Sequence, residues 1–210
     1  RNTNAALILA GLPTIRSIHV PTVLSELAYA AVSEVNGYQR VTVGAFPTRR
    51  VQAHVASDLV HLLGDLLENA LAVSPRSGGA WIRGERPASA GINAPATVKV
   101  GGSGAAVSGA ALEDLNDMLA GRADHIMTGP GVGLVVTREI ARRHSLTVQF
   151  RQLVSGGLVA TVGLPDALFE PTRQGDSASS REDDPISSMQ ATSPDLRTQT
   201  RVEADGACTL

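Results

Sequence analysis

Asp65 and Asn69 lie four residues apart in the segment DLLENA (65–70), so on a helix both side chains project from the same face. A carboxylate can orient or deprotonate an attacking group, and an amide oxygen is a hard neutral ligand that Mg²⁺ accepts beside water and phosphate oxygens. The same pair is also typical of the solvated face of an amphipathic helix. The pair alone leaves both interpretations open, and the neighbouring segments have to decide between them.

A glycine-rich segment, GPGVGL (129–134), leads directly into a helix expected at 132–144. Glycines allow the backbone to approach a ligand closely, and the amides of a helix N-terminus favour phosphate. A flexible connector is the alternative interpretation. The sequence contains no Gly-Lys-Ser/Thr run, which excludes a Walker-type phosphate loop.

A second glycine-rich turn, GGSGAAV (101–107), follows an expected strand and precedes an expected helix. A dinucleotide-binding G-x-G-x-x-G turn that starts at Gly102 meets Val107 where the third glycine belongs. No convincing strand that ends in a ribose-binding acid follows. The dinucleotide-binding interpretation is therefore disfavoured.

Hydrophobic periodicity predicts an α/β fold, with one mixed sheet covered on one face by helices. The longest expected helix carries an apolar stripe at helical period from Val51 to Ala70, which predicts burial against the core. The last two strands are separated by 154–156 and form an expected hairpin. The expected helices span 1–10, 22–35, 50–74, 109–121 and 132–144, and the expected strands span 40–46, 80–85, 96–101, 147–153 and 157–164.

Composition narrows the class of protein. The chain has 210 residues with 43% hydrophobic content, enough for one core, and its 18 basic against 20 acidic residues provide no positive field for nucleic acid. Cys208 is the only cysteine, which excludes an internal disulfide and favours the cytoplasm. The start at Arg1 indicates a fragment of a longer protein, and the polar composition of 172–210 predicts a disordered tail.

Taken in order, the helix with Asp65 and Asn69, the strand with its glycine turn and the second glycine loop resemble the ATP-binding domain of sensor histidine kinases, in the GHKL superfamily. The resemblance covers about residues 1–166 and is greatest to actinobacterial-type kinases with a short lid. It implies a two-layer α/β sandwich of the Bergerat type. It also implies that 1–20 form the end of a dimerisation helix and a linker, and that 21–171 form the ATP-binding domain.

The resemblance implies roles for individual residues. HLLGDLLENA (61–70) is similar to the N box, in which the position of Asn69 binds Mg²⁺ and that of Asp65 assists phosphoryl transfer as the catalytic residue. The second glycine box, which closes over the ATP phosphates, falls on Gly129, Gly131, Gly133 and Leu134.

The first glycine box is degenerate. The family pattern Asp-x-Gly-x-Gly-Met falls on 102–107, so Gly102 replaces the aspartate that reads the adenine amino group, Ala106 replaces the second glycine, and Gly104 is retained. Loss of one charge-assisted hydrogen bond, worth about 1.5–3 kcal/mol, weakens ATP binding by roughly ten- to 150-fold.

The phospho-acceptor histidine is not evident either. In the family it is commonly followed by an acidic residue, and none of His19, His54, His61, His125 and His144 fits that pattern. The acceptor is therefore expected upstream of Arg1, or is absent. His61 is expected to be a partly buried packing or hydrogen-bonding residue rather than a catalytic one, and Trp81 and Phe150 are expected in the core rather than as ligand platforms.

The leading hypothesis is an ATP-binding domain that transfers phosphate from Mg-ATP to a histidine outside this chain in two-component signalling. The alternative is a pseudokinase with weak or no ATP binding that serves as a regulatory or dimerisation module. A serine-kinase anti-sigma factor of the same fold is less favoured, because 1–10 looks like the end of a dimerisation helix. The expected partners are the protein's own dimerisation helices, in a homodimer, and a response regulator. The expected location is the cytoplasmic portion of a membrane-anchored sensor.

Overall fold

The computed structural model describes residues 2–10, 18–86, 95–122 and 132–171, and all structural statements below concern these residues. The helices are α1 (Asn2–Leu9), α2 (Leu24–Ser33), α3 (Ala53–Val73), α4 (Gly109–Leu119) and α5 (Val132–Arg143), with 3-10 turns at Tyr38–Arg40 and Asp166–Leu168. The strands are β1 (Thr22–Val23), β2 (Val41–Val43), β3 (Arg50–Val51), β4 (Ala80–Glu85), β5 (Ala96–Gly102), β6 (Thr147–Gln152) and β7 (Leu158–Leu164).

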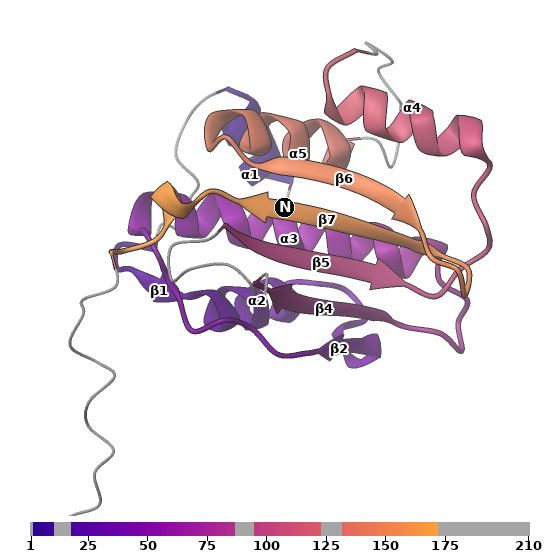
Figure 1. Ribbon diagram of the computed structural model, residues 1–210, viewed down its shortest axis with the longest axis horizontal. Coiled ribbons are helices and arrows are strands. Elements are labelled where there is room, and N and C mark those ends of the chain that lie inside the picture. The colour runs from indigo at the N-terminus through magenta and orange to yellow at the C-terminus, as the bar shows by residue number, and fades with distance from the viewer. Residues whose placement is uncertain (1, 11–17, 87–94, 123–131, 172–210) are drawn as a thin grey trace, which may run out of the picture. The chain divides into compact units, whose positions relative to one another are not determined.

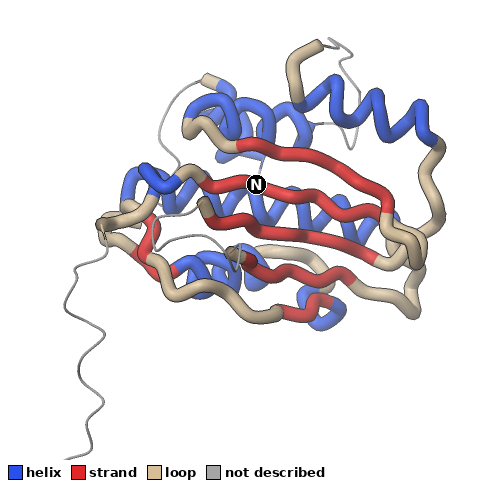
Figure 2. The backbone as a smooth tube through the Cα atoms, in the orientation of Figure 1, coloured by secondary structure: helices blue, strands red, loops and turns tan. Residues whose placement is uncertain are grey.

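Five strands form one mixed sheet in the order β2-β4-β5-β7-β6, drawn side by side in Figure 2. The β2–β4 pair is parallel and the other pairs are antiparallel. Side chains of β5 alternate, with Ala96, Val98 and Val100 buried and Thr97 and Lys99 partly exposed. Figure 1 shows α3 crossing behind these strands, which confirms the predicted mixed sheet with helices on one face.

Helix α3 provides most of the contact between the two layers. The predicted stripe is buried, since Val55, Leu59 and Leu62 are fully inaccessible and Leu66 is 2% exposed. The helix ends at Val73 because the next residue, Ser74, is extended before a proline, where the helical conformation is disfavoured. The predicted amphipathic helix is confirmed, and its burial fixes the helix against the sheet.

Several predicted boundaries were wrong near the N-terminal edge of the fold. The helix expected from 22 begins at Leu24 and the helix expected from 50 begins at Ala53, because Thr22–Val23 and Arg50–Val51 pair as a small antiparallel sheet. The strand expected over 40–46 is limited to Val41–Val43. Strand pairing between distant segments determines where these helices and strands begin and end, and local hydrophobic periodicity cannot predict such pairing.

The predicted hairpin between β6 and β7 is confirmed. The strands pair antiparallel from Thr147 opposite Gly163 to Gln152 opposite Leu158. The turn contains Gly156 and Gly157, whose φ angles of +86° and +85° lie in the left-handed region that favours glycine. In the part of the chain that the structure describes, no helix is long and apolar enough to cross a membrane.

Arg49 connects the residue before β3 to the C-terminal residues Asp166 and Phe169. Its side chain is buried, donates to Asp166 Oδ1 at 2.6 Å and lies 4.0 Å over the centre of the Phe169 ring. The neighbouring Arg50 is 56% exposed and makes a surface ion pair with Glu170. The two arginines therefore offer a matched comparison between a buried and a surface cation.

We predict that Arg49→Ala lowers the free energy of unfolding by about 2 kcal/mol, because it removes a charge-assisted hydrogen bond and a cation–π contact. Arg50→Ala serves as the control and should cost less than about 1 kcal/mol, as exposed ion pairs do. Urea denaturation of both variants measures the difference. Equal losses for the two substitutions would contradict the assignment of Arg49 as the buried anchor.

Candidate nucleotide site

The structure brings the two predicted active-site segments together. Asp65 and Asn69 lie on the C-terminal half of α3, and Gly133 lies at the start of α5. A Cβ atom on Gly133 would lie 3.6 Å from both Cβ and Cγ of Asp65. The start of α5 therefore meets the carboxylate, although 68 residues separate the two positions in the sequence.

A cavity of about 270 Å³ lies beside this contact. The residues that line it come from α3, β5, α4, α5, β6 and β7, and all except Asn69 are apolar: Leu66, Ala70, Ala72, Val73, Val100, Leu115, Leu134, Phe150, Leu158 and Ala160. Leu134 was expected at the site. Phe150 was expected in the core, and it is both 8% exposed and part of the cavity wall.

Asn69 is the one polar residue among those that line the cavity. Its Nδ2 atom is buried and has no hydrogen-bond partner in the structure. A buried donor without a partner costs about 1–3 kcal/mol, so a fold retains one only where something offsets the cost. Rotation of the amide presents its oxygen at the same place, so this position suits a cation or a polar ligand.

The first glycine turn has a different environment. Gly102, the last residue of β5, is buried, and a Cβ atom there would come within 2.7 Å of both the Ala70 carbonyl oxygen and Ser74 Oγ. A Cβ on Gly104 would come within 2.8 Å of the Val73 carbonyl oxygen. Both glycines are therefore packed against the end of α3, and neither lines the cavity.

Two of the predicted phosphate-loop residues, Gly129 and Gly131, lie outside the described residues, as does His125. The apolar wall formed by Val100, Leu115 and Leu158 was not predicted as part of a site. Each of these residues follows an ordinary core pattern in the sequence, so no local signal distinguished it. His61 is 5% exposed on α3, which agrees with the expected burial.

No model of a known protein family matches the chain, and no curated protein matches it. Solved structures match its fold. The mycobacterial sensor histidine kinase MprB aligns with a TM-score of 0.55 at 17% identity, over 74% of this chain and 100% of that one. The catalytic domain of the histidine kinase ThkA aligns with a TM-score of 0.53 at 19% identity, over 70% of this chain and 96% of that one.

Full-length ShkA, solved in complex with AMPPNP, aligns with a TM-score of 0.58 at 16% identity, over 80% of this chain and 35% of ShkA. The chain has the fold of a histidine kinase catalytic domain. It spans about a third of the length of ShkA and nearly all of the isolated ThkA domain. The matches therefore concern the catalytic domain.

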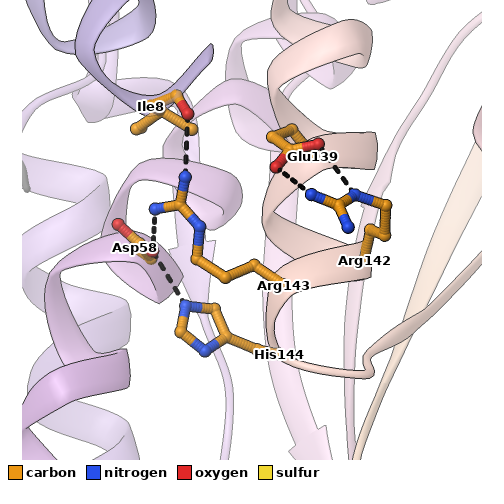
Figure 3. A network of polar contacts seen from close by, with 6 residues as sticks. All are labelled: Ile8, Asp58, Glu139, Arg142, Arg143 and His144. Atoms are coloured by element: carbon orange, nitrogen blue, oxygen red, sulfur yellow. Dashed lines mark hydrogen bonds and ion pairs between the residues drawn. The ribbon is translucent and has the colours of Figure 1, made fainter. Parts of the chain in front are cut away.

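At the opposite end of α5, the histidine kinase fold holds a polar network that the sequence did not reveal (Figure 3). Asp58 Oδ2 accepts from Arg143 at 3.1 Å and lies 2.8 Å from His144 Nε2. A second nitrogen of Arg143 donates to the Ile8 carbonyl oxygen of α1 at 2.8 Å. The His54 ring centre lies 6.2 Å from that of His144. The network thus joins α1, α3 and α5.

The environment of Asp58 changes its proton affinity. Burial alone would raise the pKa of the Asp58 carboxyl, but the hydrogen bond from His144 and the charges of His144 and Arg143 outweigh it. The pKa of Asp58 is lowered below its usual value of 3.8. A folded-state pKa below the unfolded one means that the carboxylate stabilises the fold above the unfolded pKa. This contribution is lost as pH falls through the folded pKa.

We predict that Asp58→Asn lowers the free energy of unfolding at about pH 7 by about 1.5–3 kcal/mol, since hydrogen bonds to charged groups are lost. The deficit relative to the native chain should shrink as pH falls below about pH 4, where Asp58 takes up a proton in the unfolded state, and should be lost as pH falls through the lower folded-state pKa. Urea denaturation across this pH range measures it, with Asp117→Asn, at an exposed ion pair with Arg122, as control. A deficit that stays constant down to about pH 3 would show that the charge of Asp58 is unimportant.

Two asparagines allow a test of the unpartnered amide. Asn69 Nδ2 has no partner, whereas Asn116 donates to the Leu112 and Phe150 carbonyl oxygens and accepts from the Phe150 amide at 2.8 Å. We predict that Asn69→Leu raises the free energy of unfolding by about 1–2 kcal/mol, because it removes a buried unsatisfied group. Asn116→Leu should lower it by about 1–3 kcal/mol. Thermal and urea denaturation compare the stability of the two variants. If both were destabilised to a similar extent, the unpartnered Asn69 amide would not lower the stability of the native fold.

Proposed function

We propose that this chain is the ATP-binding domain of a sensor histidine kinase and supports phosphoryl transfer from Mg-ATP to a histidine outside this chain. The observation that carries the proposal is the buried, unpartnered Nδ2 atom of Asn69, a residue on the wall of the cavity. A polar group kept there at a cost to stability is typical of a functional site. The fold shared with MprB and the ThkA catalytic domain supports the same class of protein.

The residues around the cavity fit the magnesium and phosphate end of a nucleotide. Mg²⁺ in proteins usually takes one or two side-chain oxygens and completes its shell with water and phosphate oxygens. No group of three His, Cys, Asp or Glu side chains gathers among the described residues, so Asn69 would be the protein's metal ligand and ATP would supply the rest. In this proposal the bound metal neutralises phosphate charge.

Asp65 would orient the group that receives the phosphoryl group. Its carboxylate lies one helical turn before Asn69, and its Cβ and Cγ lie beside Gly133. Since Gly133 has no side chain, the start of α5 approaches the carboxylate closely, and the helix N-terminus faces the same region. Gly129, Gly131 and Leu134 would complete the phosphate-binding loop and helix terminus in this proposal.

The packing at Gly102 favours a second candidate, a pseudokinase that binds ATP weakly or not at all and acts as a regulatory or dimerisation module. An aspartate at this position would have to displace the Ala70 backbone carbonyl, which a Cβ atom already approaches within 2.7 Å. Restoring the family's aspartate would therefore disturb the fold rather than simply repair the site.

The wider biological role follows from the same proposal. Partners would be the protein's own dimerisation helices, with α1 as the end of one, and a response regulator. The full-length protein would be a homodimer, with this domain in the cytoplasmic part of a membrane-anchored sensor. Residues 21–171 would form the ATP-binding domain and 172–210 a polar tail.

Calorimetric titration with Mg-ATP separates the two candidates. The kinase proposal predicts a dissociation constant below about 1 mM, and loss of binding when EDTA removes the metal. Asn69→Leu should abolish this binding, because the proposed metal ligand is gone. Asn36→Leu, at an exposed position, is the matched control and should bind as the native chain does.

Absence of saturation at about 10 mM Mg-ATP would reject the kinase proposal and support the pseudokinase. Binding that survives Asn69→Leu unchanged would instead show that nucleotide binds elsewhere.

A further inference from the structure

Helix α1 is attached to the rest of the fold at its C-terminal end. The Ile8 side chain is fully inaccessible and belongs to the hydrophobic core, whereas the next residue, Leu9, is exposed. The Ile8 carbonyl oxygen, in the last turn of α1, accepts a hydrogen bond from Arg143 of α5 at 2.8 Å. The last carbonyl groups of a helix have no partner within it, and a cation there also complements the helix dipole. This end of α1 is therefore held by a buried side chain and by a cation.

Arg143 is itself held by a carboxylate of α3. A second nitrogen of its guanidinium donates to Asp58 Oδ2 at 3.1 Å, and the same oxygen lies 2.8 Å from His144 Nε2 (Figure 3). The Asp58 side chain is only 10% exposed, so the pair is largely shielded from water. Separation of such a pair leaves a buried charge uncompensated, which is costly. Arg143 is thus kept in an orientation from which it reaches both α3 and α1.

A second contact to the same turn of α3 lies further along the chain. The Ile18 amide donates to Ser57 Oγ at 2.7 Å, and Ser57 precedes Asp58 directly. The described residues on both sides of 11–17 are therefore bonded to this turn, one through Arg143 and the other directly. The position of α1 depends on how this turn of α3 and the end of α5 meet.

Helix α5 connects this attachment to the candidate nucleotide site. Arg143 is the last of its 12 residues, and Gly133 and Leu134 lie in its first turn. A Cβ atom on Gly133 would lie 3.6 Å from Asp65 Cγ, and Leu134 lines the cavity. A helix of this length extends for about 18 Å and moves as one body. A displacement of its last residue therefore also displaces its first turn.

We infer that Arg143 is a positioning residue that couples the docking of α1 to the binding of Mg-ATP through α5. This inference rests on the proposed function, because it takes the region beside Asp65 and Asn69 as the place where the phosphates bind. When α1 is docked, the bonds of Arg143 hold α5 in the orientation that places its first turn beside Asp65. A ligand that binds an already ordered site avoids the entropic cost of ordering it. Docked α1 therefore favours Mg-ATP, and by reciprocity bound Mg-ATP favours docked α1 by the same factor.

Hydrogen exchange of the α1 amides measures docking in the native chain. Helix α1 has eight residues, and isolated helices shorter than about 12 residues are marginal in water, so its amides are protected only while it is docked. Saturating Mg-ATP should slow exchange at residues 6–10 by at least about five-fold, the lower end of typical coupling between sites. Helix α2, which packs on α3, is the internal reference and should slow less. No slowing in α1, or equal slowing in α1 and α2, would overturn the inference.

Two substitutions weaken the attachment from opposite sides. Ile8→Ala removes the buried contact of α1 and leaves α5 unchanged, whereas Arg143→Ala removes the cation and leaves α1 unchanged. Each should speed exchange of the α1 amides and weaken Mg-ATP binding in calorimetric titration by at least about five-fold. The matched controls are the exposed neighbours, Leu9→Ala on α1 and Arg142→Ala on α5. Neither control should change the exchange of α1 or the affinity for Mg-ATP.

Failure of the coupling and failure of the proposed function give different results. If the native chain does not bind Mg-ATP at about 10 mM, the proposed function fails and the coupling fails with it. If the native chain binds Mg-ATP and either substitution releases α1 without a change in affinity, only the coupling is overturned. Slow exchange of α1 in Arg143→Ala would also overturn it, because the cation would then not hold α1. The measurement on the native chain needs no substitution, so the decision does not depend on the stability of a variant.

Discussion

Burial of α3 between the sheet and the helices α2 and α5 determines where Asp65 and Asn69 lie. Leu59, Leu63 and Leu67 are fully inaccessible, and each buried leucine contributes roughly 1.5–3 kcal/mol through removal of its surface from water. Rotation of α3 would expose these leucines, so the helix has one stable orientation. Asp65 and Asn69 are carried on the edge of that helix, and their position is therefore set by core packing rather than by contacts of their own.

The same dependence explains what the sequence could and could not predict. The period of the α3 stripe is a local signal, and it predicted the helix and the buried face that positions Asn69. The meeting of Asp65 with Gly133 depends on how α5 crosses α3, and only resemblance to a family anticipated it. The cavity wall draws Val100, Leu115 and Leu158 from separate elements, so nothing in any one segment marks them.

At the adenine end, sequence comparison and packing answer different questions. The pattern at 102–107 predicted a missing carboxylate at Gly102. The structure shows that the space has been taken by the Ala70 carbonyl and Ser74 Oγ, with Gly157 packed on the other side. A glycine pattern reports which side chain is missing, whereas only the packed backbone reports whether a side chain still fits there. The atoms around Gly102 therefore leave no room for an aspartate side chain.

Helix α5 connects the two ends of this arrangement. Gly133 at its start meets Asp65, and Arg143 at its end bonds to Asp58, two residues of α3 that lie about 10.5 Å apart along the helix axis. A helix held against another at two such points cannot turn at one without straining the other. A partly buried ion pair adds little net stability compared with a well-packed apolar pair, but separation of the two partners leaves a buried charge uncompensated and is costly. Because Arg143 also donates to the Ile8 carbonyl oxygen, α1 is attached to the helix whose first turn contributes Leu134 to the wall of the cavity.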